Sequence, residues 1–168
     1  MSTVSKQITL QDGRVVKFRH FQAAEIIKIN KAAESEGYKS ASDLPFFMAT
    51  KLATIDDVPL SMDVLDSLPM AVGLEIVGSL SAEVTDRVTD KDGIMSGTLP
   101  SGKMVAIRPF TTGDFRKAGT RHGEAMRAFS MIEIACTIDF KPVDFVDAQM
   151  MDGLDFLAIQ AIIGADPS

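Results

Sequence analysis

The chain of 168 residues carries one sequence pattern twice, and this repeat limits what the chain can fold into. Residues 9–21 read TLQDGRVVKFRHF, and residues 98–110 read TLPSGKMVAIRPF at an offset of 89 positions. Residues 46–81 match residues 129–164 at an offset of 83 positions. A repeated unit is a structural building block, whereas two copies are too few for a solenoid. The repeat therefore predicts a tandem duplication whose halves form a pseudo-twofold dimer within one chain.

The two stretches share identical residues at turns, strand positions and helix positions. The coincident pairs are Thr9/Thr98, Leu10/Leu99, Gly13/Gly102, Val16/Val105, Arg19/Arg108, Phe21/Phe110, Phe46/Phe129, Met48/Met131, Thr54/Thr137, Ile55/Ile138, Asp56/Asp139, Pro59/Pro142, Leu74/Leu157 and Ile76/Ile159.

Composition and charge exclude several classes of protein. The hydrophobic content of 46% excludes a wholly disordered chain. No apolar run approaches the length of about 20 residues that spans a bilayer, and the first residues, MSTVSKQITL, lack the pattern of a secretory signal. The net charge of −6 and the absence of Trp argue against nucleic acid as a partner. The single cysteine, Cys136, lies among apolar residues, which indicates a buried, inert thiol in a reducing cytoplasm.

Each copy opens with the pattern of a β-hairpin. Short apolar runs flank 11–14 in the first copy and 100–103 in the second, and each turn holds a glycine, Gly13 or Gly102. Helical patterns follow over 23–36, 44–53 and 69–81, and in the second copy over 124–136 and 153–163.

The second copy departs from the first after its hairpin. Gly113, Gly119 and Gly123 predict a short or broken helix there. Ser61 and Asp144 are expected N-caps of a short helix after each proline.

The predicted fold class is α+β, a tandem repeat of a β-hairpin followed by three or four short helices. Residues 1–81 form the first hairpin-plus-helices repeat and 97–168 the second. The polar residues 82–96 have no counterpart in the repeat and are expected to be a linker. Because each copy has only about 75 residues, near the lower limit for an independent core, the halves are expected to pack on each other.

One motif partly matches the pattern of a nucleotide-binding phosphate loop. Residues 97–104, GTLPSGKM, match G-x-x-x-x-G-K but end in Met104 where a phosphate-binding loop needs Ser or Thr to hold Mg²⁺. The segment also has the pattern of a hairpin rather than of a strand followed by a helix. We therefore expect no nucleotide to bind here.

Other candidate chemistry is sparse. Asp56 recurs as Asp139 and is expected to stabilise a turn rather than to act as an acid or a metal ligand. His20 and His122 have no Cys or His at metal-ligand spacing. No nucleophile-elbow pattern is present. The sequence therefore predicts no enzyme, no catalytic residue, no metal and no cofactor.

Two sets of residues are candidates for partner binding. The apolar helix segments are rich in methionine, which suits adaptable surfaces, and Met62, Met70, Met150 and Met151 are the candidates among them. Arg19 and Arg108 end the second strand of each hairpin and either contact a partner or bind carbonyl groups at the C-terminus of a helix.

The repeated motif string resembles the phage tail assembly chaperone families. It reads TLxxGxxVxxRxF, then helices, an Asp-x-x-Pro turn and an apolar helix containing LEIVG or LAIQAIIG. The second copy, TLPSGKMVAIRPFTTGD, also resembles baseplate-hub assembly proteins of contractile-tailed phages. These families usually carry the pattern once, so the double occurrence here is a departure that leaves the oligomeric state open, a homo-oligomer included.

The resemblance implies a function without catalysis. It implies binding of the tape-measure protein or of baseplate-hub components during tail morphogenesis, in the host cytoplasm. The alternative is a structural tail or baseplate component that stays in the bacteriophage virion.

Overall fold

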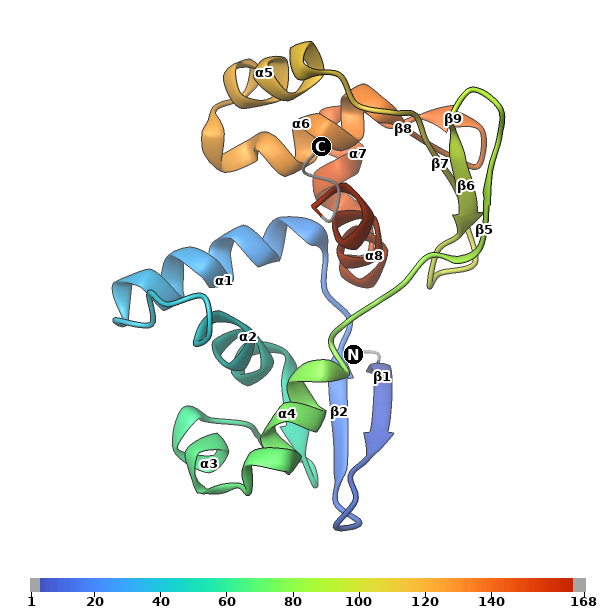
Figure 1. Cartoon of the computed structure of the whole chain (residues 1–168). Coiled ribbons are helices and arrows are strands. Elements are labelled where there is room, and N and C mark those ends of the chain that lie inside the picture. The colour runs from blue at the N-terminus through green and yellow to red at the C-terminus, as the bar shows by residue number, and fades with distance from the viewer. Residues whose placement is uncertain (1–3, 165–168) are drawn as a thin grey trace. The chain divides into compact units, whose positions relative to one another are not determined.

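The structure, a computed structural model, describes residues 4–164 (Figure 1). The chain divides into two compact units, Met1–Ser81 and Ala82–Ser168. Each unit combines an antiparallel sheet with helices, so the predicted α+β class is confirmed.

The first unit holds a four-stranded sheet of order β1-β2-β3-β4 and four helices. Its elements are β1 (Val4–Thr9), β2 (Val15–Arg19), α1 (Ala23–Ser35), α2 (Leu44–Leu52), β3 (Ala53–Ile55), β4 (Val58–Pro59), α3 (Met62–Ser67) and α4 (Met70–Gly78). The core forms between one face of β2 and the helices, because alternate residues of a strand point to the same face. Its largest fully buried side chains are Val16, Phe18, Phe21, Phe47 and Ile76.

The second unit holds a five-stranded sheet of order β5-β6-β7-β8-β9. Its elements are β5 (Thr85–Thr89), β6 (Met95–Thr98), β7 (Met104–Ile107), α5 (Thr112–Arg121), the 3₁₀ helix η1 (Glu124–Met126), α6 (Arg127–Ala135), β8 (Cys136–Ile138), β9 (Lys141–Pro142), α7 (Phe145–Met150) and α8 (Gly153–Ile163). The fully buried Val105, Phe129, Ile132 and Ile159 anchor its core.

Both predicted hairpins are confirmed. β1 pairs with β2 and β6 with β7, each antiparallel. The turn glycines adopt the left-handed conformation that other residues rarely take, with φ of 90° at Gly13 and 92° at Gly102. The expected N-caps are confirmed as well, since the side chains of Ser61 and Asp144 accept hydrogen bonds from the first turns of α3 and α7.

Residues 82–96, expected to be a linker, instead contribute β5 and the start of β6 to the second unit. All five residues of β5 are exposed, so the strand has none of the apolar alternation by which a strand is recognised. The strand is also irregular, because Asp86 has a φ of 53° and the pairing register with β6 shifts between Thr85 and Val88.

The glycine-containing helix of the second unit is short but continuous. α5 runs unbroken over ten residues that include Gly113 and Gly119. Its start is reinforced by a capping box in which Thr111 and Asp114 each accept a backbone hydrogen bond from the other residue. The helix ends at Arg121, and Gly123, two residues later, has a φ of 91°.

Candidate functional site

The two repeated arginines connect each hairpin to the helix that follows it. Arg19 lies 3.0 Å from Glu25 in the first turn of α1 and also donates to the carbonyl of Lys51 near the end of α2. Arg108 donates to both carboxylate oxygens of Asp114, at 2.7 and 3.2 Å. The hydrogen bonds from Arg108 hold the pKa of Asp114 well below its usual range.

The geometry gives both arginines a structural contact. Arg19 makes the carbonyl contact at a helix C-terminus that its structural interpretation predicted. Partner binding by Arg19 and Arg108 stays a prediction.

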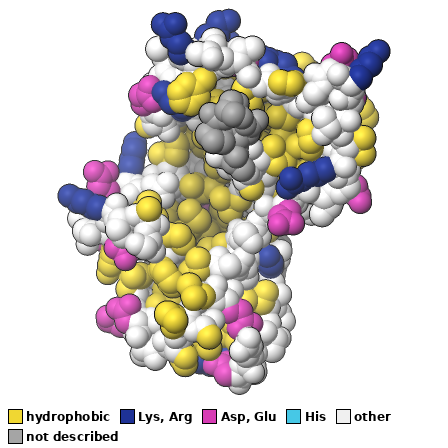
Figure 2. All heavy atoms as spheres, in the orientation of Figure 1, with side chains coloured by type: hydrophobic (Ala, Val, Ile, Leu, Met, Phe, Trp, Pro, Cys, Tyr) yellow, Lys and Arg dark blue, Asp and Glu magenta, His cyan; other side chains and the backbone are white. Residues whose placement is uncertain are grey.

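The four candidate methionines differ in exposure. Met70 is 80% exposed on α4 and Met150 is 60% exposed on α7, whereas Met62 and Met151 are half-buried. Met70 lies one helical turn before Leu74, which is 53% exposed, and Figure 2 shows hydrophobic side chains at the surface around α3 and α4. Val146 and Met150 make a similar exposed pair on α7 of the second unit. Surface contacts of this kind suit Met70 and Met150 better than the two half-buried methionines.

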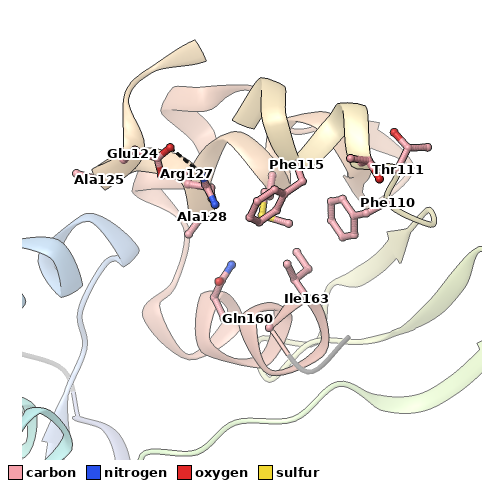
Figure 3. Close-up of a pocket in the computed structure, with 12 residues that line it drawn as sticks. Phe110, Thr111, Phe115, Glu124, Ala125, Arg127, Ala128, Gln160 and Ile163 are labelled. Atoms are coloured by element: carbon pink, nitrogen blue, oxygen red, sulfur yellow. Dashed lines mark hydrogen bonds and ion pairs between the residues drawn. The ribbon is translucent and has the colours of Figure 1, made fainter. Parts of the chain in front are cut away.

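The second unit contains a groove of about 720 Å³ that the sequence analysis did not predict (Figure 3). Three segments line it: the residues around the start of α5, the η1–α6 segment, and the last turn of α8. Its lining residues are Phe110, Thr111, Thr112, Phe115, Glu124, Ala125, Arg127, Ala128, Met131, Gln160, Ile163 and Gly164. In Figure 3, Gln160 and Ile163 point from α8 across the groove towards Phe115 and Phe110.

Arg127 is the charged residue around which one side of the groove is arranged. Its guanidinium carbon lies 4.0 Å from the centre of the Phe115 ring, a cation–π contact. The same guanidinium pairs with Glu124 at 2.6 Å. Gly119 of α5 makes room for both, because a Cβ there would lie 2.6 Å from Arg127 Nη2 and 2.7 Å from Glu124 Oε1.

Two hydrogen-bond donors at the groove have no partner within the described residues. They are Arg127 Nε and Gln160 Nε2, and both atoms are buried. Buried donors are normally paired, so this part of the groove is suited to a ligand that brings an oxygen acceptor. The remaining lining is largely apolar and aromatic, which is typical of surfaces that receive apolar side chains.

The groove was not predictable from the sequence because its walls come from segments far apart in the chain. No segment contributes more than a few apolar side chains, from the 47% exposed Phe115 of α5 to the buried Ile163 of α8. The TTGD capping box at 111–114 was a usable signal for α5. The three glycines in this stretch instead led to the prediction of a short or broken helix, and the helix is short but unbroken.

The other candidate motifs have structural surroundings. Residues 97–104 form the β6–β7 hairpin, with Lys103 exposed just after its turn. Cys136 is buried at the start of β8, and burial raises the pKa of its thiol to about 12, so that the thiol stays protonated at neutral pH.

Within residues 4–164, no group of three or more His, Cys, Asp or Glu side chains is placed to hold a metal ion. No helix in the same range has the length and apolar character needed to cross a membrane.

Comparison with family models, with curated proteins and with solved structures finds no match to this chain.

Proposed function

We propose that this protein is a non-enzymatic phage tail assembly chaperone that binds the tape-measure protein or a baseplate-hub protein during tail morphogenesis. The proposal rests on the resemblance of the repeated motif string to that family and on the groove of the second unit. A groove lined by Phe110, Phe115, Met131 and Ile163 fits the apolar face of a partner helix.

The groove is the single observation that carries a binding function. Its volume of about 720 Å³ accommodates several side chains of a partner. Among its polar groups, Thr111 is engaged in the helix cap and Glu124 is paired with Arg127, whereas Gln160 offers an amide for recognition. None of these groups forms the pair of nucleophile and base on which covalent catalysis depends.

The repeat is part of the proposal. Each unit has the order hairpin, helix, helix, short strand pair, helix, helix, and the second unit adds η1 and β5. We attribute this common order to a tandem duplication. The pseudo-twofold relation between the copies stays a prediction that an experimental structure of the whole chain tests.

In this account the protein acts in the cytoplasm of the infected host, with a protein as partner and with no role for nucleic acid, a membrane or a cofactor. Mass spectrometry of purified virions distinguishes this proposal from the alternative, a tail or baseplate component that stays in the virion. A chaperone is absent from the particles, whereas a structural component is present at a fixed number of copies.

Titration of the purified chain with the tape-measure protein of the same phage tests the proposal. Phe115→Ala removes an exposed groove side chain and is expected to weaken binding at least about tenfold, the effect of an important interface aromatic. Val88→Ala is the matched control, because Val88 is 66% exposed on β5 and does not line the groove. Absence of binding by the wild-type chain to either the tape-measure or the baseplate-hub protein would contradict the proposal.

A further inference from the structure

Phe140 is the most exposed of the large hydrophobic side chains in the described residues, at 88%. It occupies the second position of the two-residue turn between β8 and β9, and its φ is 64°. Asp139, the first residue of the turn, has a φ of 50°. A hairpin turn with two positive φ angles favours Asn and Gly, so a phenylalanine at this place is unusual.

The phenylalanine brings two unfavourable terms to the folded protein. A bulky side chain in the left-handed region is strained, by roughly 1 kcal/mol or more. An exposed ring also gains nothing from burial. Within the described residues, no aromatic or cation–π contact of Phe140 offsets these terms, and its exposure of 88% leaves little of the ring in contact with the rest of the chain.

The first unit shows that the turn does not need this ring. Its β3–β4 turn has Asp56 and Asp57 at the corresponding positions, with φ angles of 47° and 65°. Aspartate is one of the residues that tolerate this conformation, and Asp57 also pairs with Lys17 at 2.8 Å. The same backbone geometry is thus made by a short polar residue, and folding does not explain Phe140.

Phe140 lies beside the turn residue Asp139, an apolar residue and two lysines. Met104 is 42% exposed and is joined to Asp139 by two backbone-directed hydrogen bonds, which brings it beside the turn. Lys103 and Lys141, the sequence neighbours of Met104 and Phe140, are both exposed. Lys141 has no ion pair within the part of the chain that the structure describes. We name these four residues the Phe140 surface.

We infer that the Phe140 surface is a second docking point, at which the Phe140 ring enters an apolar pocket rimmed by carboxylates on the tape-measure protein. The inference rests on the proposed function, because it takes the same protein as the partner. Aromatic side chains, phenylalanine included, are enriched at protein interfaces, and hot spots are side chains that fill a desolvated pocket of the partner. The two exposed lysines favour an acidic rim, since complementary charges raise the association rate and select the partner.

The test compares the same substitution at the two corresponding turns. Phe140→Asn removes the ring and supplies a residue that suits the left-handed conformation, so we expect the melting temperature to be unchanged or higher. We expect affinity for the purified tape-measure protein to fall at least about 30-fold, as for a hot-spot residue. The control Asp57→Asn keeps the wild-type affinity. Phe140→Trp is expected to retain most of the affinity, and Lys141→Glu to reduce both the affinity and its dependence on salt.

The outcomes separate the two proposals. If Phe140→Asn binds as tightly as the wild type, the Phe140 inference is wrong and the chaperone proposal stands. If the wild type does not bind the tape-measure protein, this inference fails together with tape-measure binding, and the baseplate-hub protein remains as the partner to test. If sedimentation shows that the wild type self-associates and Phe140→Asn does not, a second copy occupies the surface, which also overturns the inference.

Discussion

Asp139 and Met104 are joined by two hydrogen bonds: the Met104 N–H donates to Asp139 Oδ1 at 3.0 Å, and the Asp139 N–H donates to the Met104 carbonyl at 2.8 Å. Asp56 and Val15 make the same pair of bonds in the first unit, at 2.9 and 2.8 Å. The repeated aspartate therefore holds the short hairpin against the start of the preceding strand. This contact gives a physical reason for an aspartate at both positions.

We expect Asp139→Ala to destabilise the protein by about 1–2 kcal/mol. The substitution removes a hydrogen bond worth about 1 kcal/mol and places a residue with a Cβ but no polar side chain at a positive φ. Urea unfolding of the whole chain measures the loss. Asp139→Asn keeps an acceptor and tolerates the conformation, so an equal loss in both variants would refute this explanation.

Asp114 and Arg108 predict how the protein responds to acid. The pKa of Asp114 is lowered in the folded state by its hydrogen bonds with Arg108 and with the start of α5. Its stabilising effect is therefore present above the ordinary value of 3.8 and is lost as the pH falls below that value. Asp114→Asn should reduce stability at pH 7 by about 1 kcal/mol or more, because it weakens the hydrogen bonds from Arg108 to a charged carboxylate. The free energy of unfolding of this variant should also fall less steeply below pH 4 than that of the wild type. An unchanged pH dependence below pH 4 would show that Asp114 does not have a lowered pKa.

Asp155 is expected to respond in the opposite direction. This aspartate of α8 is 3% exposed and accepts hydrogen bonds from the N–H and the hydroxyl of Ser101 in the β6–β7 turn, at 2.9 and 2.5 Å. Burial raises its pKa above 3.8 despite these bonds. The folded state then binds the proton more tightly than the unfolded state, so this group's contribution to stability falls as the pH rises through the window just above 3.8.

The variant Asp155→Asn isolates that effect. It should remove the fall in stability across this window, which urea unfolding at a series of pH values detects. Ser101→Ala removes a hydrogen bond to the carboxylate and should raise the pKa of Asp155 further, moving the fall to higher pH. A stability profile that neither substitution changes would show that Asp155 does not titrate there.

Gly119→Ala distinguishes the role of the groove in partner binding from its role in the stability of α5. Alanine gains up to about 1 kcal/mol of helix propensity, but its Cβ displaces the ends of the Arg127 and Glu124 side chains. The ion pair and the cation–π contact that are disturbed are each worth about 0.5–1 kcal/mol at an exposed site. We therefore expect a change in unfolding free energy of less than about 1 kcal/mol, together with weaker partner binding. Unchanged binding would show that Arg127 has no part in recognition.

The sequence predicted those elements whose signals are local. The hairpins followed from turns that contain Gly13 or Gly102, and α3 and α7 from the caps Ser61 and Asp144. The strand pairs β3–β4 and β8–β9 were missed as hairpins, since their central residues are Asp-Asp and Asp-Phe rather than Asn-Gly.

The other misses have two causes: β5 has no buried face, and the groove depends on contacts between distant segments. β5 is recognisable only by its pairing with β6, because none of its residues is buried. The groove needs Phe115 and Gln160, from helices about 45 positions apart, to face one another, and periodicity within one helix does not contain that information. Met70 and Met150 were found from composition, but their exposure was not predictable from it.

Hydrogen–deuterium exchange of the whole chain, with and without the purified tape-measure protein, tests most directly whether the groove is a protein-binding site. The account predicts slower exchange on binding in α5, in the η1–α6 segment and in the last turn of α8, with little change in α1. A complex that leaves these three segments unprotected, or no complex with the tape-measure or baseplate-hub protein at all, would contradict it.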